Sequence, residues 1–345
     1  MNANLARRCH DHRPDLRHNR RHNRRRLQIF ALTAAGLLSS GVWSQSAWPD
    51  KPIRVLLPFP PGGPSDMVMR LAAEKMQQSL KQTIVIDNKP GAGGNLGTAE
   101  VARAAPDGYT WLWGTDTLVT VNPFVYKKLP FKVDDLLPVT IGTQFDQTLV
   151  CNPSLGAKTL AELVAKAKAG TLNYASGGAG VPGHLSMELL KASVGFEMAH
   201  VPYKGPAPAA QDVIGGQVPC GFLAGPTVLP HIRSGRLVAL AVSGSRRSPT
   251  LPEVPTVAET GLPGTAGFVS EFSLAMFAPR GTPEPIVARF RQAFVDALRA
   301  PDVMEKLKAS DQAVVGNTPT EAAKLLAADA KKWGAVAQRI GLGLD

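Results

Sequence analysis

Four glycine-rich turns are the segments of this sequence most suited to binding a ligand. The segments "PFPPGGPSD", "NKPGAGGNLGT", "YASGGAGVPGH" and "HVPYKGPAPA" each follow an apolar run and lead into a helical pattern. Small polar or charged side chains stand at these helix starts: Ser65, Asn95, Ser176 and Lys204. The first N–H groups of a helix lack intrahelical partners and lie at the positive end of its dipole, and glycine lets a ligand approach them closely. The turns therefore predict a site for an anion, most simply a carboxylate.

Other kinds of site are poorly supported. The chain has no phosphate-binding GxxxxGK[ST] loop, and Ser176 does not lie in a GxSxG turn because Tyr174 replaces the first glycine. His184, His200 and His231 show no metal-ligand spacing with cysteines or carboxylates. We therefore predict a binding protein without catalytic residues, metal or cofactor.

One enzymatic alternative stays open. Gly178, Gly180 and Gly183 match the GxGxxG dinucleotide fingerprint, and Glu197 follows about 20 residues later, where a ribose-binding acid is expected. This pattern would suit a nucleotide-dependent oxidoreductase. Pro182 inside the turn and the place of Glu197 at the start of its strand weigh against it.

The beginning of the chain predicts export. Residues 1–26 hold nine arginines, and the apolar stretch Leu27–Trp43 is short for a membrane-spanning helix. Small residues follow near Ala47, so residues 1–47 read as a signal peptide with a long basic n-region. The "NRRRL" run at 23–27 leaves both the general secretory (Sec) and the twin-arginine routes open. We expect a periplasmic protein that is not embedded in the membrane once processed.

The leader also accounts for most of the positive charge. The whole chain carries +11, whereas nine arginines less Asp11 and Asp15 give the leader +7 and leave +4 for the remainder. Nucleic-acid binding therefore loses its main support. About 300 residues remain, enough for two domains. Cys151 and Cys220 lie in apolar runs that favour small buried core residues, while export would permit a disulfide.

Apolar runs and helical patterns alternate along the chain, which predicts an α/β fold with largely parallel sheets. The expected strands are 53–59, 83–87, 109–114, 148–152, 172–175, 196–201, 218–223, 237–242 and 272–278. The expected helices are 65–80, 95–104, 159–169, 183–193, 206–214, 284–299, 301–309 and 319–339. Thr282 and Thr318 each precede a proline and are predicted helix caps, the second with Glu321 as a capping box. No polar linker marks a boundary, so we expect two lobes between which the chain crosses near 141–147 and 267–273.

The segments after residue 48 together resemble a known family. "WPDKPIRVLLPFPPGGPSD", "NKPGAGGNLGTAEVARAAPDGYT", "YASGGAGVPGHLSMELL", "HVPYKGPAPAAQDVIGGQV", "LPEVPTVAETGLPG" and "APRGTPEPIV" occur in the order found in the periplasmic solute-binding (Bug) receptors of tripartite tricarboxylate transporters. The resemblance implies a two-lobed periplasmic-binding-protein fold of the Venus flytrap, type II-like kind. Lobe 1 would hold residues 48–145 and 272–345, and lobe 2 residues 146–271.

The resemblance also implies a function. The protein would be a monomer that captures a small carboxylate between its lobes and delivers it to the permease subunits of a tripartite transporter. A solute sensor that hands its ligand to a signalling partner would use the same fold.

The family pattern assigns ligand contact to residues of the four turns. They are Gly63, Ser65, Asp66, Gly94, Asn95, Ser176, Gly178, Gly180, His184 and Tyr203. The turn at Thr115 and Asp116 follows a strand, and we expect it to join them. The sequence departs from the pattern before "APRGTP", where Ser273, Leu274 and Ala275 replace the Trp-x-Gly of many members. The pocket wall there is therefore expected to differ.

Overall fold

The computed structural model describes residues 48–343. The predicted signal peptide, residues 1–47, lies outside the described residues. Residues 49–343 belong to one compact unit. Within this described part, no helix is both long and apolar enough to cross a bilayer.

The first part of the sheet holds three parallel strands and a returning antiparallel one. β1 (Ile53–Leu57) lies between β2 (Ile84–Asn88) and β3 (Thr110–Thr115), and β9 (Glu271–Pro279) pairs antiparallel with β3. β4 (Leu136–Cys151) pairs antiparallel with β9 and with the short β10 (Ala313–Val314). β1 and β3 are almost wholly buried, as expected of strands covered on both faces.

The second part of the sheet is built on the far end of β4. There β4 pairs antiparallel with β7 (Cys220–Ala224) and β8 (Val238–Val242). β5 (Asn173–Ser176) lies parallel to β7 on one side and to β6 (Ala199–Pro202) on the other. The order is therefore β2-β1-β3-β9-β4-β7-β5-β6.

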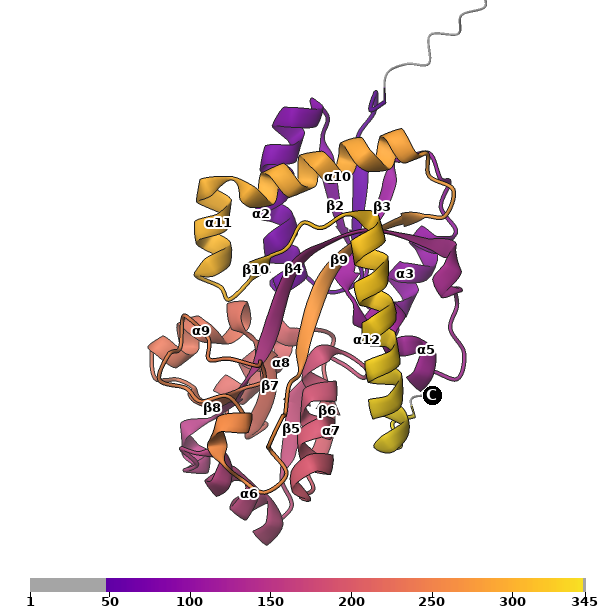
Figure 1. The fold of residues 1–345 in the computed structure, drawn as a ribbon. Coiled ribbons are helices and arrows are strands. Elements are labelled where there is room, and N and C mark those ends of the chain that lie inside the picture. The colour runs from indigo at the N-terminus through magenta and orange to yellow at the C-terminus, as the bar shows by residue number, and fades with distance from the viewer. Residues whose placement is uncertain (1–47, 344–345) are drawn as a thin grey trace, which may run out of the picture. The chain divides into compact units, whose positions relative to one another are not determined.

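β4 is thus common to both parts of the sheet, and β4 and β9 run side by side between the upper and lower groups of elements (Figure 1). The prediction of a strand at 148–152 found only its last residues, and the prediction of largely parallel sheets was wrong. Every partner of β4 in the described chain is antiparallel. β9 is antiparallel to β4 because it returns the chain along the same path. The lobe boundaries remain a prediction.

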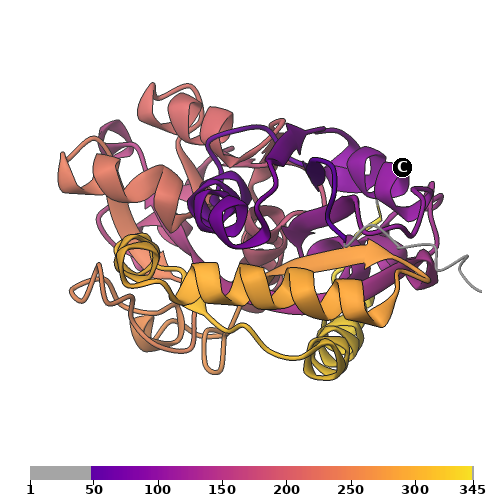
Figure 2. The same cartoon turned by 90° about the horizontal axis from the view of Figure 1, so that it is seen from above.

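Helices cover the first part of the sheet on both faces. α2 (Pro64–Leu80) and α10 (Glu284–Arg299) lie side by side on one face (Figures 1 and 2). There Trp111 stacks on Phe290, with ring centroids 3.9 Å apart, and Trp113 meets Phe294. Leu112 points the other way, as strand alternation requires, into a core shared with α3 (Asn95–Ala102) and α12 (Pro319–Arg339). The short α11 (Pro301–Lys308) follows α10.

Four further helices belong to the second part: α6 (Leu160–Ala169), α7 (Pro182–Val194), α8 (Pro206–Ile214) and α9 (Gly225–Arg233). α9 was not predicted, because Gly225, Pro226 and an internal Pro230 are residues that usually interrupt a helix. The short α4 (Thr117–Thr120) and α5 (Asn122–Val125) were also missed.

The predicted helix caps had different outcomes. Thr318 caps α12 in a capping box with Glu321, as predicted. The cap predicted at Thr282 was wrong. Thr282 Oγ1 instead donates to the carbonyl of Pro279, 2.8 Å away, and α10 begins after Pro283 without a side-chain cap.

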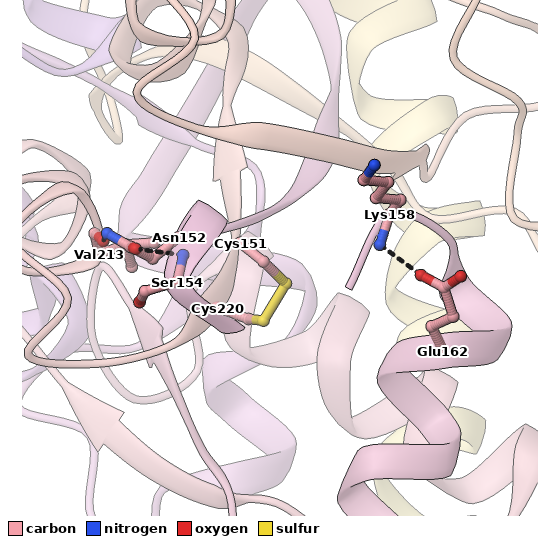
Figure 3. The surroundings of a disulfide bond; sticks show 7 residues. All are labelled: Cys151, Asn152, Ser154, Lys158, Glu162, Val213 and Cys220. Atoms are coloured by element: carbon pink, nitrogen blue, oxygen red, sulfur yellow. Dashed lines mark hydrogen bonds between the residues drawn. A yellow bond between two sulfur atoms is a disulfide. The ribbon is translucent and has the colours of Figure 1, made fainter. Parts of the chain in front are cut away.

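The two cysteines of the described chain are joined. Cys151 in β4 and Cys220 in β7 face each other across the antiparallel ladder, and both are fully buried (Figure 3). The favoured interpretation of two unpaired core residues is therefore corrected in favour of the disulfide. Next to the bond, Asn152 Nδ2 donates to the carbonyls of Val213 and Ile214, at 2.9 Å each, and so holds the end of α8 against the end of β4.

Asp146 lies in β4 opposite Glu271 of β9, and with Asp311 these residues line one cavity. Burial, together with the charges of Asp311 and Glu271, raises the pKa of Asp146 to about 7. Because its folded-state pKa lies above the unfolded value, the folded protein binds this proton more tightly. Stability is therefore gained as the pH falls from about 7 towards 4 and is lost once the group ionises.

We expect Asp146→Asn to raise the free energy of unfolding at pH 8 by about 1–3 kcal/mol, after allowance for solvent screening, and to raise it clearly less at pH 5, where the folded protein holds the proton. Urea denaturation at both pH values measures this. Asp134→Asn, at a side chain that is 93% exposed, is the control. An equal effect of Asp146→Asn at the two pH values would contradict the expectation.

Candidate functional site

The main candidate site is a cavity between the two parts of the sheet, which we call the cleft cavity. Its atom-free space is about 490 Å³, part of it open to solvent. The turn before α2, the end of β3 and the middle of β4 and β9 line it from one side, and the turns before α7, α8 and α9 from the other. The lining residues are Phe59, Gly63, Pro64, Ser65, Thr115, Phe145, Gln147, Gly177, Val181, Pro182, Gly183, Pro206, Phe222, Leu223, Ala224 and Leu274.

Four helices begin at this cavity. α2, α7, α8 and α9 each contribute a lining residue from their first turn or from the cap before it. None of the four has a side-chain cap, and each has proline at its first or second position. Uncapped helices occur elsewhere in this chain, so the missing caps alone mean little. The convergence of four positive helix ends on one cavity is what favours an anion.

The turn before α2 is held by Asp66. Its Oδ2 accepts hydrogen bonds from Gly62 N at 3.1 Å and from Arg70 Nε at 2.9 Å, and its Oδ1 accepts one from Asn88 Nδ2. Burial alone would raise the pKa of Asp66, but these bonds outweigh it and hold that pKa below its usual value. The Asp66 carboxylate is thus committed to the turn, which places Gly63 and Ser65 at the cavity.

The end of β3 contributes Thr115, whose Oγ1 lies 2.7 Å from that of Thr117. The neighbouring Asp116 is buried away from the cavity, and its Oδ2 accepts a hydrogen bond from Ser273 N at 3.0 Å. Burial, with a contribution from Asp329, raises the pKa of Asp116 well above its usual value. Asp116 therefore fastens β3 to β9 and does not line the cleft cavity.

The loop 176–183 is held from beneath by polar side chains. Ser176 Oγ donates to the carbonyl of Gly178 and lies 2.6 Å from His200 Nε2, and His184 Nδ1 accepts from Gly180 N at 3.0 Å. The rings of His184 and His200 stack 3.9 Å apart.

Both histidines of this stack are neutral at ordinary pH. Burial lowers the pKa of His184 to about 4 and that of His200 to about 3. A neutral His184 can accept the hydrogen bond from Gly180 that shapes the loop. These side chains therefore fix the loop backbone, and the cavity meets Gly177, Val181, Pro182 and Gly183 of this segment.

A second cavity lies next to the first and shares Phe59 and Gly177 with it. This rim cavity is lined by the turn Pro90–Gly94 and by the loops at 177–179 and 202–204, and it holds the predicted residues Gly94, Gly178 and Tyr203. Across it Tyr126 Oη donates to the carbonyl of Ala179 at 3.2 Å. Tyr203 Oη donates to Asp212 Oδ2 at 2.5 Å. Asn95 lines neither cavity, and its Oδ1 accepts from Asn122 Nδ2.

The predicted residues therefore divide into three groups. Gly63, Ser65 and Thr115 line the cleft cavity, while Gly94, Gly178 and Tyr203 line the rim cavity. The others hold turns or strands in place: Asp66, Asn95, Asp116, Ser176, Gly180 and His184.

Sequence reasoning missed several residues. Phe145 and Gln147 were part of a predicted lobe crossing only, and Phe222 resembled an ordinary core residue of a strand. Leu274 was identified only as part of a pocket wall that differs from the family pattern. His200 could be noticed in the sequence, because it is one of only three histidines after the predicted signal peptide. Nothing in the sequence indicated that it would lie against Ser176.

Comparison with known proteins identifies the family. Residues 68–342 match the family model described as the tripartite tricarboxylate transporter family receptor. The chain is 37% identical to protein BugT of Bordetella pertussis over 305 residues, which are 87% of this chain and 93% of BugT.

Solved structures of related proteins have the same fold. The periplasmic binding protein BugD superimposes with a TM-score of 0.81 at 32% identity, covering 86% of this chain and 99% of BugD. An R. palustris protein solved with adipate gives 0.82 at 32% identity, covering 85% and 98%. The predicted two-lobed periplasmic-binding-protein fold is confirmed, and the comparisons do not favour the dinucleotide alternative.

Proposed function

Because the chain belongs to the tripartite tricarboxylate transporter receptor family, we propose that it captures a small carboxylate in the cleft cavity and delivers it to a membrane permease. It acts in the periplasm, after removal of residues 1–47, as a monomeric receptor without catalytic activity. Residues 48–145 with 272–345, and residues 146–271, are its two lobes.

The convergence of four uncapped helix starts on the cleft cavity carries this proposal. An anion there receives backbone N–H groups and the positive ends of the helix dipoles from both sides of the cavity. The relative solved with adipate supports a carboxylate as that anion. The ligand bridges the two sides, so its binding favours the arrangement in which they meet.

The residues take distinct parts in this proposal. Gly63, Ser65 and Thr115 contact the ligand directly, and Gly94, Gly178 and Tyr203 close the rim above it. The turn-holding residues named above keep the backbone donors in place.

A thermal-shift screen of the processed protein against carboxylates, with nicotinamide dinucleotides included, tests the function. A ligand at 100 times its dissociation constant adds about 2.7 kcal/mol of stability, which raises the melting temperature by several degrees. A shift with carboxylates is expected. If no carboxylate raises the melting temperature and a dinucleotide clearly does, the proposal is overturned.

Ser176→Ala should weaken binding of the most effective acid in that screen about tenfold, because the hydroxyl fixes Gly178 in the loop. Titration calorimetry measures the affinity, and circular dichroism should show an unchanged fold. Ser154→Ala, at an exposed serine in the loop after β4, is the control. Wild-type affinity in Ser176→Ala would remove Ser176 from the binding machinery.

A further inference from the structure

A tyrosine of the first part of the molecule reaches across the rim cavity to a loop of the second part. Tyr126 directly follows α5, and its Oη donates to the carbonyl of Ala179, 3.2 Å away, in the loop between β5 and α7. Burial raises the pKa of the Tyr126 phenol, so the group holds the proton that it donates at neutral pH. Tyr126 lines the rim cavity and does not line the cleft cavity. It therefore joins the two sides without touching a ligand in the cleft.

The acceptor belongs to a loop that also forms part of the ligand site. Ala179 lies between Gly177 and Val181, and both of these residues line the cleft cavity. Val181 is 6% exposed and packs with Phe59 and Leu118 of the first part. The loop thus meets the first part at the ligand site and at the rim together. A movement that separates one contact therefore separates the other.

Neither end of this hydrogen bond depends on it for its own shape. On the first side, Asn122 Nδ2 donates to the carbonyl of Gly93 at 3.3 Å and to Asn95 Oδ1 at 2.7 Å. On the second side, the hydrogen bonds of Ser176 and His184 hold the loop. The bond between Tyr126 and the loop therefore depends on whether the two sides meet.

Gly93 leaves the space in which this contact forms. A Cβ at Gly93 would overlap Tyr126 Oη and would stand 2.8 Å from the carbonyl oxygen of Ala179. Any larger residue would therefore force the phenol and the carbonyl apart.

We propose that Tyr126 is a positioning residue that latches the closed receptor. Its hydroxyl bonds the carbonyl of Ala179 when the two sides meet around a carboxylate, and the bond opens in the free receptor. The latch therefore slows release of the bound ligand. This inference rests on the proposed function of the cleft cavity as a carboxylate site.

The latch acts on release because its partners meet only in the closed arrangement. A ligand that enters the open cleft contacts neither partner, so the rate of association does not depend on Tyr126. Before the ligand leaves, the two sides must separate and break the bond. One neutral hydrogen bond of this kind shifts an equilibrium by about threefold to tenfold. The latch thus adds to the closure that the ligand itself drives.

Tyr126→Phe tests the latch, because it removes the hydroxyl and keeps the ring. The probe is the carboxylate that gives the largest shift in the thermal-shift screen. Stopped-flow measurements of intrinsic fluorescence on the processed protein give its association and dissociation rates. We expect dissociation about threefold to tenfold faster and association unchanged. Urea denaturation should show an unchanged free energy of unfolding for the free protein, since the bond is open there.

Tyr109→Phe is the matched control. Tyr109 Oη donates to Asp50 Oδ1 within the first part, and Tyr109 lines neither cavity. Its removal should leave both rates unchanged.

An unchanged dissociation rate in Tyr126→Phe would overturn the latch. A slower association that accounts for the whole loss of affinity would overturn it too, because the hydroxyl would then act on entry. So would a free variant that loses as much stability as it loses in binding, because the bond would then be a permanent part of the fold. In these three cases the carboxylate still binds, so the receptor function stands. If no carboxylate binds the unaltered protein, the proposed function and the latch are both overturned.

Discussion

Replacing Cys151 and Cys220 together by alanine is expected to lower the free energy of unfolding by about 4 kcal/mol. The two cysteines are 69 residues apart, and a bond that closes a loop of this length restricts the unfolded chain by about that amount in the loop-entropy model. Domains are commonly stable by only about 5–15 kcal/mol, so the variant should unfold at much lower urea concentrations.

Reduction of the unaltered protein gives an independent measurement. Urea denaturation in dithiothreitol should bring the unaltered protein to within about 1 kcal/mol of the double variant. The reductant should leave the double variant itself unchanged. Titration of two free thiols in the denatured, unreduced processed protein, which lacks Cys9, would contradict the disulfide.

Gly183→Ala is expected to reduce ligand affinity at least 100-fold and to cost about 2–4 kcal/mol of stability. A Cβ at this position would stand 2.2 Å from the carbonyl oxygen of Phe222, which is backbone and cannot rotate away. The start of α7 must therefore move from β7. Because Val181, Pro182 and Phe222 line the cleft cavity, this movement distorts the binding surface itself.

Calorimetry with the best acid from the screen measures the affinity of Gly183→Ala, and urea denaturation measures its stability. Gly170→Ala is the matched control, because a Cβ there meets no atom within 4 Å and the backbone is extended. Near-native affinity in Gly183→Ala would show that α7 and β7 can separate without consequence for the site.

Much of the fold could be predicted because strands and helices alternate with clear turns between them. The misses have local causes. Pro138 and Gly142 break the pattern of β4, and its register with β9 shifts twice near them. Strand direction was the larger error, since it depends on which strands carry the chain between the two parts of the sheet, and no periodicity records that.

The candidate site was only partly readable from the sequence. The glycine turns located the helix starts, because a bare helix start depends on residues close together in the chain. The side chains that hold each turn are distant in sequence. Asn88 donates a hydrogen bond to Asp66, and His200 lies against Ser176. A polar residue beside a glycine turn therefore looks the same in sequence whether it faces the ligand or the backbone.

The position of β9 also bears on the order in which the chain can fold. β9 occupies the place between β3 and β4, although some 160 residues separate it in sequence from β3. Contacts across such separations are slow to form, since a long loop must close before they add stability. Until residues 271–279 are available, β3 and β4 present open edges to any other strand. Acquisition of the native structure therefore waits for the C-terminal part of the polypeptide.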